Sequence, residues 1–128
     1  MTNGNSAVIE EIRNISHDSG TITFSVDWYH PATTTNFKVA WALDAVAIPD
    51  NSALNGTFGS AVQVNDTGGT TNKLYISPTS TAVTIGGTPA PNNLVIFRIR
   101  RVATDGTNDT LAVDAGMIGV RINFGRLA

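Results

Sequence analysis

Three arginines crowd the end of one apolar run and are the most chemically distinctive residues of the chain. The run "NNLVIFRIRR" ends with Arg98, Arg100 and Arg101. A guanidinium can hold a carboxylate or a phosphate through two parallel hydrogen bonds. The outward positions of the run carry no lysine and no ring for stacking on a base. The formal net charge of −2 also argues against bulk attraction to nucleic acid.

We therefore expect a face that contacts other protein, because arginine is enriched and lysine depleted at such interfaces. A simple solvated face is the alternative. Asp109 and Asp114 flank residues 110–113 and could pair with the arginines across the sheet or between subunits. Alternatively, one of the two aspartates is a turn residue and the other is an exposed carboxylate. The predicted protein–protein interface comprises Arg98, Arg100, Arg101, Arg121, Asp109 and Asp114.

The remaining polar residues give little support for catalysis or for metal binding. His17 precedes Asp18, but adjacent residues usually point apart, and no nucleophile motif accompanies them. Two histidines, His17 and His30, without any cysteine argue against zinc. The stretch "DGTND" at 105–109 lacks the glycine and glutamate of a calcium loop, so a tight turn explains it better. We expect no enzyme, no metal and no cofactor.

Alternation of apolar and polar residues predicts the strands that position the charged groups. In residues 21–29, one face carries Ile22, Phe24, Val26 and Trp28. In residues 36–43, one face carries Phe37, Val39, Trp41 and Leu43. In the arginine run, Val95, Phe97 and Ile99 are expected to point inward and Leu94, Ile96, Arg98 and Arg100 outward.

Turn-forming residues separate many short strands, which is typical of an all-β domain. Further strands are expected at 7–15, 61–65, 73–77, 82–85, 93–101, 110–114 and 117–124, and one helical turn could form near 51–54. About eight or nine strands with regular spacing predict an antiparallel β-sandwich or jelly roll. The length suits one domain, so we expect an N-terminal arm at 1–6 and a single domain at 7–128.

The composition and the first residues bear on where the chain works. No cysteine is present, which excludes disulfides and thiolate metal sites. The opening "MTNGNSAVIEEI" has neither the basic nor the apolar region of a signal peptide. No apolar stretch approaches the roughly 18 residues that a membrane span needs. We expect a protein with no membrane partner that is made in the cytoplasm and stays soluble or assembles there.

Several segments between Gly56 and Phe124 together resemble small β-sandwich proteins of tailed bacteriophages. The segments that carry the resemblance are "GSAVQVNDT" (59–67), "LYIS" (74–77), "VTIGGTP" (83–89), "LVIFRIRR" (94–101) and "DTLAVDAGMIGV" (109–120). Gly116 and Met117 depart from the pattern, which has an arginine and a leucine after "DA". An inter-subunit pairing made by that arginine therefore does not carry over.

The resemblance implies a virion structural protein with a jelly-roll-like fold. It implies a homotrimer that binds the major capsid protein lattice on the capsid exterior, as cement or decoration proteins do, and stabilises the head. On this hypothesis the chain assembles in the host cytoplasm and has no direct contact with nucleic acid. The arginine run would then serve as an assembly face.

Two other roles compete with the capsid role. A head- or tail-fibre module that binds a host receptor or glycan would need an exposed aromatic ring among Trp28, Tyr29, Trp41 and Tyr75. Alternation places both tryptophans with the core, which weakens that alternative. A small enzyme such as a depolymerase fragment would need paired carboxylates in a cleft, and Asp27, Asp44 and Asp66 show no such spacing.

Overall fold

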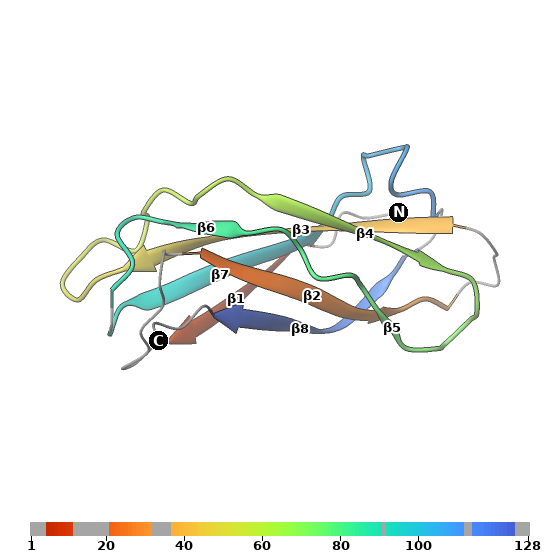
Figure 1. Cartoon of the computed structure of the whole chain (residues 1–128), viewed down its shortest axis with the longest axis horizontal. Helices are drawn as coiled ribbons and strands as arrows, with labels where there is room; N and C mark the ends of the chain where they lie inside the picture. The colour runs from red at the N-terminus through yellow and green to blue at the C-terminus, as the bar shows by residue number, and fades with distance from the viewer. Residues whose placement is uncertain (1–4, 12–20, 32–36, 91, 112–113, 125–128) are drawn as a thin grey trace.

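The computed structural model describes residues 5–11, 21–31, 37–90, 92–111 and 114–124, and within them the chain is all-β, as predicted. No helix in these ranges is long and apolar enough to cross a membrane. The strands are β1 (Asn5–Glu11), β2 (Thr21–Tyr29), β3 (Phe37–Ile48), β4 (Val62–Gly68), β5 (Tyr75–Ile76), β6 (Val83–Gly86), β7 (Leu94–Arg101) and β8 (Gly116–Phe124) (Figure 1).

The strands form one mixed sheet whose path does not close. Its order is β1-β7-β3-β6-β2-β5, with β4 beside β3 and β8 beside β2. The prediction of a purely antiparallel sheet is wrong at one place, since β6 runs parallel to β3 at Ala45↔Ile85 and Val46↔Gly86. Alternating side chains look the same in parallel and antiparallel strands, so the sequence pattern cannot reveal strand direction. The sandwich or jelly-roll arrangement stays a prediction.

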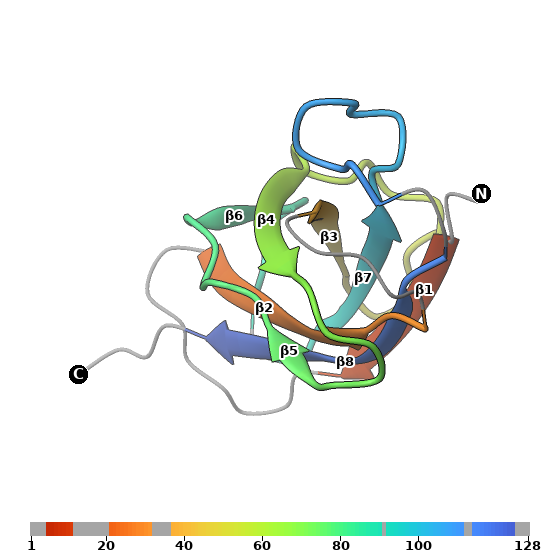
Figure 2. The ribbon, with the colours of Figure 1, turned by 90° about the vertical axis from the view of Figure 1, so that its right-hand side faces the viewer.

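The hydrophobic core draws most of its side chains from β2, β3 and β7. Figure 2 shows β2, β5 and β8 on one side of the molecule and β3, β4 and β7 on the other. The inner faces predicted for β2, β3 and β7 are confirmed, because all of these side chains are buried: Ile22, Phe24, Val26, Trp28, Phe37, Val39, Trp41, Leu43, Val95, Phe97 and Ile99. Each such side chain stabilises the fold by roughly 1.5–3 kcal/mol.

Strand β3 is buried on both faces and is longer than the alternation predicts. It continues beyond Leu43 through "DAVAI", where buried residues follow one another without a break. The loop at 49–61 covers its outer face, because a Cβ on Gly56 would lie 3.1 Å from side-chain atoms of Val46 and Ile48. The Gly59 N–H of the same loop donates a hydrogen bond of 3.1 Å to Ala45 O. A strand covered on both sides reads as a continuous apolar run. The end of such a strand therefore cannot be read from period-2 alternation.

Two further expectations differ from the structure: the bounds of the first strand and the helical turn near residues 51–54. Strand β1 begins at Asn5, so it includes two residues assigned to the arm, and it ends at Glu11. Residues 12–15 of the expected strand and residues 1–4 of the arm lie outside the described residues. The turn near 51–54 is not helical, because Asn51 has a φ of 60°, which a right-handed helix does not use.

The strand expected at 110–114 is wrong for the residues that the structure describes there. Thr110 and Leu111 lie outside any strand, and their N–H groups share one acceptor, Lys38 O, at 2.9 and 3.3 Å. A strand ladder would give each N–H its own carbonyl. Thr110 and Leu111 therefore belong to a loop anchored on β3, and the next strand among the described residues is β8.

Candidate assembly surface

Arg98 points outward from β7, as predicted, and is held by a carboxylate. Its Nε lies 2.9 Å from Asp44 Oδ1 and its Nη2 2.5 Å from Oδ2. The two residues are direct register partners on β7 and β3. The Arg98 side chain is 50% exposed while that of Asp44 is only 5% exposed. The hydrogen bonds to Asp44 raise the pKa of Arg98 above its ordinary value, so the group remains a cation.

One face of the Arg98 guanidinium is covered by an aromatic ring. Its central carbon lies 3.8 Å from the centroid of Phe58, which belongs to the loop over β3. A cation over a ring is attracted by the ring's quadrupole. Two contacts therefore fix the direction of Arg98, and half of its side chain still faces solvent. A preorganised and partly solvated guanidinium suits recognition of a carboxylate on another chain.

The sequence analysis missed Asp44 as the partner of Arg98, although a signal for it existed. Extending the predicted segment 36–43 by one residue places Asp44 on the outer face with Lys38 and Ala42. The register of β3 with β7, which brings Asp44 opposite Arg98, could not be read from either strand alone. Phe58 had no signal, because it reaches Arg98 from a loop.

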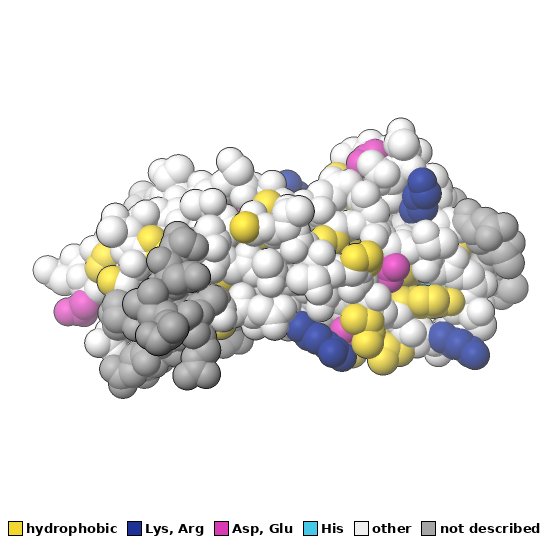
Figure 3. All heavy atoms as spheres, viewed as in Figure 1, with side chains coloured by type: hydrophobic (Ala, Val, Ile, Leu, Met, Phe, Trp, Pro, Cys, Tyr) yellow, Lys and Arg dark blue, Asp and Glu magenta, His cyan; other side chains and the backbone are white. Residues whose placement is uncertain are grey.

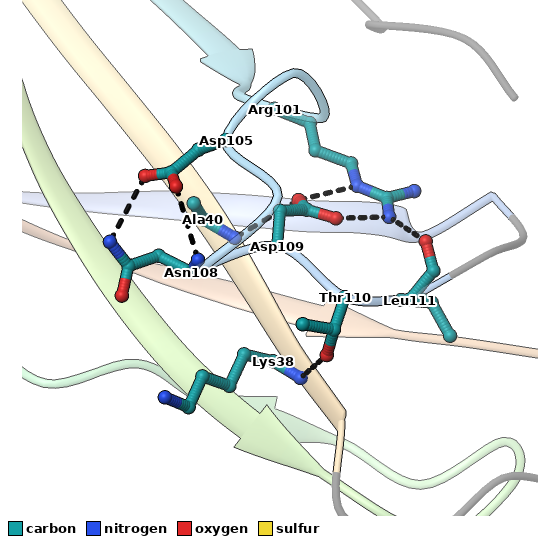
Figure 4. Close-up of polar contacts among 8 residues, drawn as sticks. All are labelled: Lys38, Ala40, Arg101, Asp105, Asn108, Asp109, Thr110 and Leu111. Carbon is teal, nitrogen blue, oxygen red and sulfur yellow. Dashed lines mark hydrogen bonds and ion pairs between the residues drawn. The ribbon is translucent and has the colours of Figure 1, made fainter.

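Arg101 and Asp109 are paired inside the chain, as Figure 4 shows. The Arg101 Nε and Nη2 donate to the two Asp109 carboxylate oxygens at 2.8 and 2.6 Å, and Nη2 also donates to Leu111 O at 2.6 Å. Asp109 Oδ2 accepts a further bond of 3.1 Å from the Ala40 N–H. The two side chains are 3% and 0% exposed. Neither therefore reaches the surface of the single chain.

The face of Arg101 follows from the same alternation that orients Arg98. Val95, Phe97 and Ile99 point inward, and Arg101 is the next residue in that series. The structure thus separates the three arginines of the run. Arg98 is exposed, Arg100 is half-buried beside Ala42, and Arg101 joins the core face.

The loop that presents Asp109 is shaped by a second carboxylate, that of Asp105. It accepts hydrogen bonds from Gln63 Nε2, from Asn108 Nδ2 and N, and from Thr107 N, at 3.0 to 3.2 Å. These bonds, the one from Gln63 foremost, lower the pKa of Asp105 to about 2. "DGTND" is therefore a hydrogen-bonded turn, and the described ranges contain no group of three or more His, Asp or Glu side chains placed to hold a metal ion.

Arg121 lies on β8 and forms a looser ion pair. Its Nε and Nη2 each lie 3.2 Å from Asp27 Oδ2, and the side chains are 57% and 17% exposed. Because β8 pairs with β2 while β7 pairs with β3, the structure does not bring Arg121 to the face that carries Arg98. Asp114 is exposed in the segment before β8. The predicted interface residues thus divide between two faces and the interior.

Exposed apolar side chains accompany the Arg121–Asp27 pair. Figure 3 shows hydrophobic side chains beside basic and acidic ones over the end of the molecule with β2, β5 and β8. Asp27 lies opposite Ile76 of β5, and Tyr29 lies opposite Gly116 of β8. The exposed fractions are 38% for Tyr29, 56% for Leu74, 48% for Ile76 and 60% for Ile118. Exposed apolar patches with a polar rim often mark protein–protein contacts.

The side chains considered for catalysis or sugar stacking are mostly inside. His30 is completely buried, with its ring 4.5 Å from that of Phe37 and 5.9 Å from that of Tyr75. Trp28 and Trp41 are 0% and 3% exposed. His30 therefore cannot reach a substrate from this position, and neither tryptophan presents a free ring. The placement of His17 lies outside the described residues.

Comparison with known proteins gives no match for this chain, whether against family models, curated proteins or solved structures.

Proposed function

We propose that this chain is a structural protein that works by binding other protein chains, namely a cement or decoration protein of a tailed-phage capsid. It would bind the major capsid protein lattice as a homotrimer, on the capsid exterior, after assembly in the host cytoplasm. One observation carries the proposal furthest: each outer face presents an arginine oriented by a less exposed aspartate. On the β2–β5–β8 face, exposed apolar side chains stand beside it. This combination is typical of protein–protein interfaces.

The finer description of the fold belongs to the same proposal. We infer a jelly-roll-like β-sandwich in which β6 joins the two layers at one edge by pairing with both β3 and β2. Two observations support it. The buried cluster draws side chains from β2, β3 and β7, and the Phe97 and Phe124 rings approach across the core at 6.4 Å. The resemblance to phage β-sandwich proteins points to the same architecture.

A fibre module that binds a host receptor or glycan is the second candidate. Tyr29 favours it, because 38% of the surface of this residue is accessible. Sugar binding usually needs an open aromatic face, and both tryptophans are buried. The capsid role therefore has the stronger support, because it requires no free ring.

The copy number of this chain in particles tests the proposal. Virions from the phage that encodes it would be separated into heads and tails, and the chain would be quantified by mass spectrometry in each fraction. Hundreds of copies on heads are expected for a trimer placed throughout a capsid lattice. A handful of copies on tails or at one vertex would contradict the cement role and favour the fibre module. Absence from all particles would overturn both.

A further inference from the structure

We propose that Asn55 is a site of spontaneous covalent modification, in which the side-chain amide deamidates through attack by the Gly56 nitrogen. Asn55 precedes a glycine in the loop over β3 and its side chain is exposed. Neither the Asn55 amide nor the Gly56 N–H is hydrogen-bonded in the part of the chain that the structure describes. No hydrogen bond in that part of the chain therefore has to break before the Gly56 nitrogen attacks the Asn55 side-chain carbon.

The chemistry needs no partner except water. The Gly56 nitrogen loses its proton and bonds to the Asn55 side-chain carbonyl carbon, and ammonia leaves, so that a five-membered imide closes. Water then opens the imide at either carbonyl and gives aspartate or isoaspartate. Glycine favours the closure because it has no Cβ to shield its nitrogen or to restrict its backbone. Because Asn55 is exposed, solvent water can reach the imide.

Other asparagines in the described ranges lack this combination. Asn65 and Asn108 have side chains bound to Gln63 and Asp105. Asn93 is buried, and its Oδ1 accepts a bond from Ala90 N. Three more, Asn51, Asn72 and Asn92, are followed by serine, lysine and asparagine. The second Asn-Gly pair of the chain, at residues 3 and 4, lies outside the described residues and serves as an internal comparison.

The residues after Asn55 leave little room for a longer backbone. A Cβ on Gly56 would lie 3.1 Å from Ile48 and Val46 side-chain atoms, so this backbone rests directly on β3. Thr57 O closely approaches Gly86 on the side of β6, and the Gly59 N–H is bound to Ala45 O. Isoaspartate adds one atom to the main chain just before this fixed segment. The extra atom would displace Phe58 from the Arg98 guanidinium above it.

Peptide mapping of the intact purified chain tests the proposal. After incubation at neutral and at mildly alkaline pH, trypsin releases the peptide from Val39 to Lys73, and fragmentation spectra locate any amide converted to acid. We expect a converted form at Asn55 that grows with time and faster at higher pH, because the attacking nitrogen must lose a proton. Fragmentation that distinguishes isoaspartate from aspartate should find both. Asn55→Gln should abolish the signal, whereas the matched control Asn51→Gln should leave it unchanged.

Two results would overturn the proposal. One is an unconverted Asn55 under conditions in which the Asn-Gly pair of the Met1–Arg13 peptide is converted. The other is conversion located at Asn51, Asn65 or Asn72 instead. Hydrogen exchange of the converted chain then tests the structural consequence: amides of residues 54–58 should exchange faster than in the Asn55→Gln variant. Equal exchange would show that the loop absorbs the added atom and would overturn the predicted displacement of Phe58.

Discussion

The Arg101–Asp109 and Arg98–Asp44 pairs use the same chemistry and have opposite surroundings. Both arginines belong to β7, and each holds an aspartate through its Nε and Nη2. The side chains of the first pair are 3% and 0% exposed, and those of the second are 50% and 5% exposed. Geometry alone therefore does not tell a structural ion pair from one available to a partner. The exposure of the guanidinium does.

Desolvation explains why this difference matters. Two charges taken out of water repay their desolvation only if every polar atom is satisfied. Asp109 meets that condition with bonds from Arg101 and Ala40 N, and Arg101 adds a bond to Leu111 O. Arg98 keeps half of its side chain in water, so it loses little solvation and can still bind another carboxylate. We infer that the inner pair fixes the loop after β7 and the outer pair serves assembly.

The largest predicted effect comes from removing one partner of the inner pair. Asp109→Ala leaves the Arg101 guanidinium buried and unpaired and removes the acceptor of the Ala40 N–H. We expect a loss of about 3–5 kcal/mol in the free energy of unfolding, which is typical for breaking a buried pair. Urea unfolding followed by tryptophan fluorescence measures it, because both tryptophans are buried.

The double variant Arg101→Met with Asp109→Leu provides the matched control. Apolar replacement of a whole buried pair is often neutral or stabilising, since no charge stays unpaired. We therefore expect the double variant to be more stable than Asp109→Ala alone. If the single variant unfolds at the wild-type urea concentration, the inner pair does not hold this loop and the comparison fails.

A smaller effect is expected for the outer pair. Arg98→Ala leaves the Asp44 carboxylate, which is 5% exposed, without its donor and uncovers Phe58. Leaving a mostly buried acceptor unsatisfied costs about 1–3 kcal/mol, and water that enters the vacated space should bring the loss to the low end. Arg98→Lys is the informative control, because lysine keeps the charge but cannot form the fork. A loss as large as that of Asp109→Ala would contradict the assigned difference.

Much of the contrast between the pairs was present in the sequence, but the partners were not. Successive side chains of β7 point to opposite faces, so that Arg98 points outward while Arg101 lies on the same face as Phe97 and Ile99. Pairing depends instead on contacts between distant parts of the chain, such as Asp44 with Arg98 across 54 positions. Single-strand periodicity contains no information on register between strands. For the same reason the parallel β3–β6 contact was not foreseen.

Asp105, in the loop that carries Asp109, is expected to make the stability of the fold depend on pH in the acid range. The folded-state pKa of Asp105 is about 2, below its ordinary 3.8, so its ionised form stabilises the fold above the ordinary value. That stabilisation is lost as the pH falls from about 4 to about 2. Asp105→Ala should therefore give a flatter dependence of stability on pH in this window. Urea midpoints measured at several pH values would show it, and an unchanged slope would place the acid response elsewhere.

The smallest effect on stability is expected for substitution of Arg121. Any effect of this substitution on assembly should be large compared with its effect on stability. The Arg121–Asp27 contacts of 3.2 Å join two side chains that are 57% and 17% exposed. Exposed pairs contribute roughly 0–1 kcal/mol and weaken in salt. Arg121→Ala should therefore leave the urea midpoint almost unchanged.

If the β2–β5–β8 face binds a partner chain, the same variant, alone or with Ile118→Asp, should lower the oligomer mass seen by light scattering or the amount bound to heads. Because Asn123→Ala changes another exposed residue of β8, it is the matched control. Equal assembly of all three variants would remove this face from the interface and leave the Arg98 face to carry it.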